Sequence, residues 1–295
     1  MTTDYAGPTA VTILELGAMR ADNPDYRLNP GYFEDQFLVT EKHLKQLGAE
    51  PLGRFIPDTL PDGSKGITYG QVGARILSPR GSVRYLQVIN IRDTGIDFAI
   101  KPDRVAENSH NDPERSRVKV GDILFTNNAF RGTDTLLGRC IVVHRDYGKV
   151  NISQHIDRIR VQGVSPYYVV IYLKTKFGQL QIERVVHGVD SSGISFGRIR
   201  ELLIPNLTGP EQVEVERQYL DISKHHDRAM AIKERLLEES GIEPGQFGDA
   251  INKLASEKPA YRRAMAEAKQ RLDHLVAQLE AVIDGQQKKL RPFAV

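Results

Sequence analysis

The C-terminal stretch of residues 211–239 restricts the fold most, because it contains neither Gly nor Pro. Its apolar residues recur in alternating steps of four and three, which predicts a long helix with one apolar stripe. Two polar residues, His226 and Lys233, interrupt that stripe. Residues 241–259 end the helix, and a second apolar stripe runs over residues 261–282. The two stripes predict two long helices that form an antiparallel hairpin.

The second stripe supplies the residues that we expect to contact another chain: Tyr261, Met265, Leu272, Leu275, Leu279 and Val282. Burial of one aliphatic side chain contributes roughly 1.5–3 kcal/mol, so these residues could hold a symmetric homodimer together. Internal pairing with the helix at 211–239 would use the same stripe. We therefore expect residues 209–295 to form a helical spacer that dimerises or binds a partner protein.

Residues 1–208 combine strand and helix patterns and predict one globular domain, which gives the chain an α/β (α+β) fold class. Alternating residues predict a strand over residues 83–96, with a turn at Asp93-Thr94-Gly95. Ser165 and Pro166 are typical of a helix start. The other expected strands lie at residues 11–16, 123–125, 138–143 and 151–161, and the other expected helices at 31–47, 177–186 and 249–256.

The composition, 40% hydrophobic and 26% charged, is typical of a soluble globular protein. The single cysteine, Cys140, cannot form an internal disulfide, which fits a reducing cytoplasm. The N-terminus lacks the pattern of a signal peptide, and no apolar run is long enough to span a bilayer. We therefore expect a cytoplasmic protein with no membrane partner.

Sequence motifs for catalysis are absent. No glycine-rich nucleotide-binding loop, H-E-x-x-H, G-x-S-x-G or C-x-x-C pattern occurs, and one Cys with scattered His gives no zinc-ligand spacing. Cys140 lies in an apolar strand, where a thiol is usually a core residue. We expect no catalytic residue, no bound metal and no cofactor in this chain.

Basic residues are concentrated in the polar loops of the globular part. Residues 61–160 contain 16 Lys and Arg against 11 Asp and Glu, whereas residues 209–295 contain 14 against 15. Such an excess favours phosphate contacts, and Arg, Asn and Gln can form paired hydrogen bonds with bases. Our candidates for DNA contact are Lys65 for phosphate, with Arg80, Arg92, Asn127, Asn128, Arg131, Ser153, Gln154, His155 and Arg158 for bases.

The order of several segments resembles a known family. YLQVINIRDTGI is followed by VKVGDILF, NISQHIDRIRV, PYYVVIYLKT and a long heptad helix. This order, from about Leu52 to about Ile283, is similar to the DNA-specificity (S) subunit of type I restriction–modification enzymes. In that family a target-recognition domain reads DNA and a helix acts as spacer. Only one recognition pattern is present here, so the resemblance implies a half-length form.

The resemblance implies partners as well as a fold. It implies double-stranded DNA, a methyltransferase subunit that would bind S-adenosylmethionine, and in some systems a restriction subunit. It also implies a homodimer that reads a bipartite target. Two other functions fit the same features: a coiled-coil scaffold whose globular domain binds protein, and a stand-alone nuclease with a dispersed site.

Overall fold

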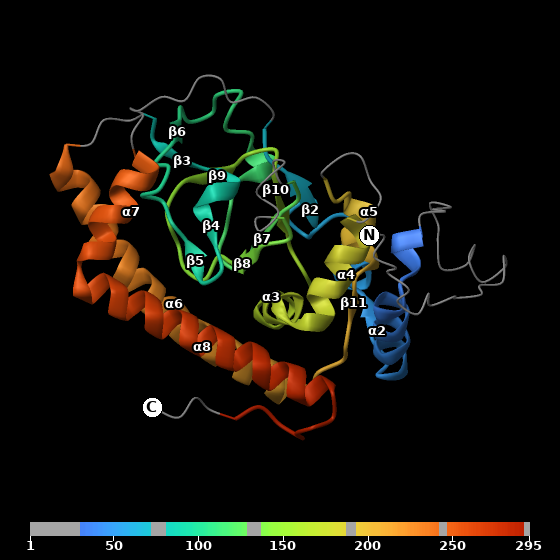
Figure 1. The fold of residues 1–295 in the computed structure, drawn as a ribbon. Coiled ribbons are helices and arrows are strands. Elements are labelled where there is room, and N and C mark those ends of the chain that lie inside the picture. Colours follow the sequence, from blue (N-terminus) through green and yellow to red (C-terminus); the bar gives the residue numbers. More distant parts are fainter. Residues whose placement is uncertain (1–29, 72–80, 129–136, 187–192, 242–246, 292–295) are drawn as a thin grey trace, which may run out of the picture.

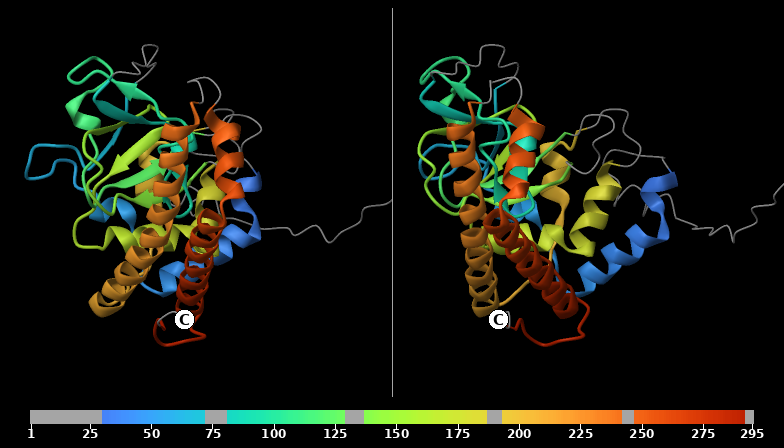
Figure 2. Two further views of the ribbon diagram at one scale, coloured as in Figure 1. Left: turned by 90° about the vertical axis from the view of Figure 1, so that its left-hand side faces the viewer. Right: turned by 60° about the vertical axis from the view of Figure 1, so that its left-hand side comes forward.

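The chain has a mixed α/β architecture, which confirms the expected fold class. The computed structural model describes residues 30–71, 81–128, 137–186, 193–241 and 247–291 (Figure 1). The strand expected at 11–16 lies outside these residues. Small sheets occupy one side of the molecule, and two long helices, α6 (Gly209–Ser240) and α8 (Pro259–Ile283), run side by side along another (Figure 2).

The strands are short. Their bounds are β1 Glu50–Pro51, β2 Ile67–Tyr69, β3 Val83–Leu86, β4 Ile91–Arg92, β5 Gly95–Ile96, β6 Arg104–Val105, β7 Ile123–Thr126, β8 Cys140–Val142, β9 Val150–Ile152, β10 Ile156–Ile159 and β11 Leu203–Ile204. An antiparallel sheet has the order β2-β10-β7-β8. A second sheet has the order β6-β3-β9, with β3 and β9 parallel, and the pairs β4-β5 and β1-β11 are antiparallel.

The remaining elements are helices. Their bounds are α2 Asp35–Gln46, α3 Pro166–Lys174, α4 Lys176–Val186, α5 Phe196–Glu201 and α7 Phe247–Glu257, with the short 3-10 turns η1 Pro30–Phe33, η2 Leu52–Phe55, η3 Val88–Asn90 and η4 Glu114–Ser116. Pro166 stands at the first turn of α3, as the sequence predicts. The helix expected over residues 31–47 is divided into η1 and α2, and Gly48 follows it with φ +68°.

Two apolar cores lie on the two faces of the four-stranded sheet. Leu124 of β7 and Ile141 of β8 face a core that β3, β4, β5, β9 and β10 also enclose. Phe125 and Cys140, one residue away, face a larger core with the buried helix α3 and the hairpin helices. Alternate side chains of each strand therefore pack against the other sheets on one face and against the helices on the other.

The strand expected over residues 83–96 is broken into β3, η3 and the hairpin β4-β5. Asn90 stabilises the break: its side chain accepts a hydrogen bond from the backbone nitrogen of Gln87 at 2.8 Å. It also donates to the backbone oxygens of Asp97, at 2.8 Å, and Lys101, at 3.1 Å. These bonds pair backbone groups that a continuous strand would pair with its neighbours.

The internal hairpin uses the stripe that we assigned to a dimer. Leu272, Leu275 and Leu279 of α8 are at most 6% exposed and lie in the same core as Val215 and Tyr219 of α6. In this conformation the chain's own helices cover these leucines, and their contact with a second chain stays a prediction.

The other three stripe residues are also engaged within the chain. Tyr261 and Met265 are partly buried against a cluster that includes Ala229 and Met230 of α6, and Val282 packs against the large core. The hairpin thus shares its core with the globular part. A homodimer and a domain boundary at residue 208 stay predictions.

Candidate nucleic-acid interface

Three strand ends meet at one edge of the sheets. Gln71 and Ser153 form a parallel backbone bridge there, just after β2 and β9. Gly70 permits this close approach, because a Cβ on Gly70 would lie 1.8 Å from the carbonyl oxygen of Ile152. The backbone nitrogen of Ser153 also donates to the carbonyl oxygen of Leu86, at the end of β3, at 2.8 Å. The backbone around Gln71 is therefore fixed by its neighbours.

Five polar side chains lie at this edge, and we call them the polar rim: Gln71, His110, Arg115, Gln154 and His155. Gln71 donates to His110 Nε2 at 2.7 Å and accepts from Arg115 Nη2 at 3.4 Å. Gln154 donates to His155 Nε2 at 3.0 Å, and burial lowers the pKa of that imidazole. All five side chains remain at least partly exposed. Together they offer amide, imidazole and guanidinium groups to a ligand.

A buried asparagine holds the loop of residues 108–117, which carries two members of the polar rim. Asn151 of β9 is fully buried and donates to Asp112 Oδ1 at 2.8 Å. It also accepts from Ser116 Oγ at 2.7 Å. Arg117 pairs with the buried Asp112 carboxylate from the same loop. The loop is therefore tied to β9 by buried polar contacts, which fix its path.

Contrary to our expectation, Arg158 does not face solvent. Its side chain on β10 is fully buried, opposite Leu124 of β7. Nη2 donates to the backbone oxygens of Lys65, at 2.9 Å, and Arg115, at 3.2 Å. Desolvation lowers the pKa of this guanidinium to about 10. In this conformation the side chain lies inside the sheets and presents no surface to DNA.

Asn127, at the end of β7, points inward. Its amide donates to Asp157 Oδ1 at 2.6 Å and to the backbone oxygen of Gln154 at 3.3 Å. Asp157 is fully buried, and desolvation raises its pKa to about 8 against the opposing effect of the Asn127 hydrogen bond. The carboxyl group is therefore protonated at neutral pH. Asn127 supports the turn that carries Gln154 rather than presenting its amide to solvent.

The remaining candidates for DNA contact are scattered. Lys65 is exposed, with Nζ 3.3 Å from Thr59 Oγ1. Asn128 is partly buried and its backbone bridges to Gly193. Ser153 is only 8% exposed. Arg80 and Arg131 lie outside the described residues.

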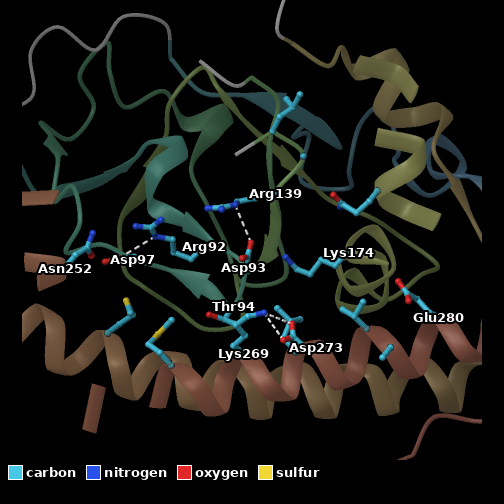
Figure 3. Close-up of a pocket in the computed structure, with 18 of the residues that line it drawn as sticks. Arg92, Asp93, Thr94, Asp97, Arg139, Lys174, Asn252, Lys269, Asp273 and Glu280 are labelled. Carbon is cyan, nitrogen blue, oxygen red and sulfur yellow. Dashed lines mark hydrogen bonds and ion pairs between the residues drawn. The ribbon is translucent and has the colours of Figure 1, made fainter. Parts of the chain in front are cut away.

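Arg92 lies away from the polar rim, in a groove between the β4-β5 hairpin and α8 (Figure 3). The groove has a volume of about 870 Å³. Its basic groups are balanced by acidic ones: Arg92 lies 3.8 Å from Asp97, and Arg139 lies 3.4 Å from Asp93. A surface with this balance attracts phosphate weakly, so its geometry disfavours the expected DNA contact of Arg92.

The β4-β5 hairpin is fixed to α6 and α7 by a set of mostly buried polar side chains, which we call the docking network: Thr94, Asp97, His226, Lys233 and Asn252. Lys233 Nζ lies 2.5 Å from Asp97 Oδ2 and donates to Asn252 Oδ1 at 2.6 Å. His226 accepts from Thr94 Oγ1 at 2.8 Å and donates from Nε2 to the Ile96 carbonyl at 3.0 Å. The two residues that interrupt the α6 stripe are therefore the ones that bind the hairpin.

Close backbone approach accompanies this network. A Cβ on Gly95 would lie 2.5 Å from Cδ2 of His226, so the turn between β4 and β5 fits against the imidazole only as glycine. Burial lowers the pKa of His226, which keeps the ring neutral with one donor and one acceptor. The turn at residues 93–95 consequently faces the helices and is not at the polar rim.

Sequence reasoning missed three members of the polar rim: Gln71, His110 and Arg115. Gln71 follows a glycine in a loop-rich stretch, and His110 and Arg115 lie in a polar loop with no periodicity. The only available signal was the combination of Gly70 with an amide at a strand end. Residue spacing alone could not show that these loops meet.

No family model and no curated protein matches the chain. A chain from a structural study of complex assembly and conformational transition in the type I R-M system is similar to it, with a TM-score of 0.37 and 12% identity. The similarity covers 87% of this chain and 56% of that one. A likeness of this size does not establish family or fold.

No described helix is both long and apolar enough to cross a membrane. The described residues also contain no cluster of three or more His, Cys, Asp or Glu side chains suited to a metal ion.

Proposed function

We propose that this chain is a DNA-recognition subunit whose polar rim reads bases in a groove of double-stranded DNA. The observation that carries the proposal is the meeting of Gln71, His110, Arg115, Gln154 and His155 at one edge of the sheets. Amides can pair with adenine and guanidinium with guanine, so this set has the chemistry of direct base reading.

The contacts beneath the rim support the same proposal. Side chains that read bases must be held in place before DNA arrives, because ordering them on binding costs free energy. Here a buried asparagine ties down the loop of residues 108–117, and a glycine fixes the backbone beside Gln71. Lys65 is exposed and belongs to a stretch with excess basic charge, which suits phosphate contact.

The role that we propose is that of a half-length specificity subunit of a type I-like restriction–modification complex. The proposal rests on the order of sequence segments described above, together with the polar rim and the long helical hairpin. In this role the chain itself is not catalytic. A methyltransferase subunit supplies S-adenosylmethionine chemistry, and a restriction subunit is a further partner. Two copies of the chain read the two halves of an inverted-repeat target.

The groove beside α8 is the surface that we assign to the methyltransferase subunit. Met265, Leu272 and Val276 contribute apolar lining. Charged residues of both signs, such as Lys174 and Glu280, also line the groove (Figure 3). Such a groove suits an amphipathic helix with mixed charges. An Ala277→Glu variant is expected to lose co-purification with a co-expressed methyltransferase subunit while keeping its thermal stability, because Ala277 lines the groove and is exposed.

Selection from a randomised duplex pool tests the proposed function. The purified chain, alone and with a co-expressed methyltransferase subunit, is expected to enrich one sequence motif. Arg115→Ala is expected to relax the motif at one position, at a cost of about 1–3 kcal/mol for the best site. Arg217→Ala, which removes an exposed guanidinium from α6, serves as the matched control. Absence of any enriched motif would contradict base reading and favour a protein-binding scaffold, whereas metal-dependent cleavage by the chain alone would favour a nuclease.

A further inference from the structure

We infer that Arg158 is a specificity-determining positioning residue. It does not contact DNA, and its hydrogen bonds inside the sheets hold the residues of the polar rim in position. The inference rests on the proposed function and deepens it, because it names the buried group that holds two reading loops in register. Its basis is the pair of hydrogen bonds from one guanidinium nitrogen to two separate loops.

Those two loops carry the residues that meet at Gln71. The carbonyl of Lys65 precedes β2, which leads through Gly70 to Gln71. The carbonyl of Arg115 belongs to η4, and the Arg115 side chain donates to Gln71. Arg158 therefore joins the backbones of two segments whose side chains also meet at the surface. A shift of either loop would change the geometry of Gln71 and Arg115 together.

The position of Arg158 in its strand makes this joint rigid. β10 lies between β2 and β7, and Arg158 is in register with Thr68 on one side and Leu124 on the other. Its side chain cannot move outward, because the residue is fully buried. The central part of the sheet thus fixes the donor nitrogen, and the hydrogen bonds from this nitrogen fix the positions of the two loops.

The electrostatics argue against a role in stability alone. Among the described residues, Arg158 has no ion pair, and its Nε and Nη1 have no hydrogen-bond partner. A buried cation that forms no ion pair is costly to stability, and here the charges of Asp122 and Asp62 oppose the desolvation without pairing with the guanidinium. Other buried arginines of the chain are different: Arg184 pairs with Glu41 and stacks on Tyr32.

The test compares Arg158→Met with the wild-type chain in selection from a randomised duplex pool, followed by titration of the best duplex and a scrambled duplex. We expect Arg158→Met to fold cooperatively and to bind the scrambled duplex with unchanged affinity and salt dependence. We expect its preference for the best duplex over the scrambled one to fall about tenfold or more. Arg184→Met is the matched control: it is expected to lower the melting temperature and to leave the preference unchanged.

The outcomes separate this inference from the proposed function. If the wild-type chain enriches no motif, the proposed function fails and the inference fails with it. If the wild-type chain enriches a motif and Arg158→Met discriminates equally well, only the inference is overturned. Equal losses of affinity for both duplexes, with a lower melting temperature, would also overturn it. Should Arg158→Met not fold, Arg158→Lys takes its place: its ammonium stops short of the Nη2 position, so a smaller loss of preference is expected, and unchanged preference contradicts the inference.

Discussion

The polar rim and the docking network are built from similar side chains, but their surroundings differ. In the docking network Lys233 is fully buried and Asp97 is 2% exposed, and both bond to other residues of the network or the backbone. In the polar rim His110 and Arg115 are exposed and contact Gln71 only at their tips. Buried polar groups that satisfy one another fix two parts of a chain together, whereas exposed ones keep capacity for a ligand.

The largest effect is expected from breaking the docking network at Lys233. Lys233→Ala removes the buried cation nearest to Asp97 and leaves the partly exposed Arg92, 3.8 Å away, as its remaining ion pair, so a loss of about 3–5 kcal/mol is expected. Urea unfolding of the wild-type protein and of Lys233→Ala measures this difference in the free energy of unfolding. Lys269→Ala is the control, because Lys269 forms an exposed pair with Asp273 on one helix, worth about 0.3–0.5 kcal/mol. Equal losses for the two variants would show that the network does not fix the hairpin.

A smaller loss is expected at the glycine of the β4-β5 turn. Gly95→Ala places a methyl group against the His226 ring and should cost about 1–3 kcal/mol by overpacking. The melting temperature should fall accordingly. Gly248→Ala in α7, where no atom lies within 4 Å of an added Cβ, should be neutral or slightly stabilising. An unchanged melting temperature in Gly95→Ala would mean that the turn does not rest on His226.

The buried carboxyl of Asp157 predicts a pH dependence. Its folded pKa of about 8 lies above the ordinary value of 3.8, so the folded chain binds one more proton than the unfolded chain between these values. Stability therefore falls as pH rises through this window, by about 1–2 kcal/mol between pH 6 and 7.5. Asp157→Asn should remove this slope and be the more stable protein at pH 8. A wild-type stability that rises with pH over the same window, with the same trend in the variant, would refute this ionisation.

The smallest effect is expected at Lys65, whose side chain is exposed. Lys65→Ala should leave stability unchanged and reduce the slope of log affinity against log salt by about 1, uniformly across DNA sequences. Titrations at several salt concentrations measure the slope. If the variant instead changes the preferred motif, Lys65 reads a base and belongs to the polar rim.

Periodic and capped segments of the chain could be predicted from sequence. Both hairpin helices and α3 lie where their apolar stripes and the Ser165-Pro166 start place them, because those signals are local. The sequence does not decide how the second stripe pairs. The chain buries this stripe internally. The sequence cannot predict this outcome, because the same leucines would suit either an internal hairpin or a dimer.

Long-range polar contacts could not be predicted. His226 and Lys233 were visible only as interruptions, and their partners lie 132 and 136 positions away in the β4-β5 hairpin. Arg158 looked like a solvent-facing residue because strand alternation does not show which faces are covered. Its partners are backbone oxygens of two irregular loops, which leave no sequence pattern.

Hydrogen exchange of the whole chain, with and without the duplex that it enriches, tests the central claim most directly. DNA should slow exchange at residues 66–71, 108–117 and 153–156, which contain the polar rim and its backbone supports. Exchange at residues 92–97 and 226–233, which form most of the docking network, should not change. Protection confined to the docking network or to α8, with none at the polar rim, would contradict the placement of DNA recognition at this edge.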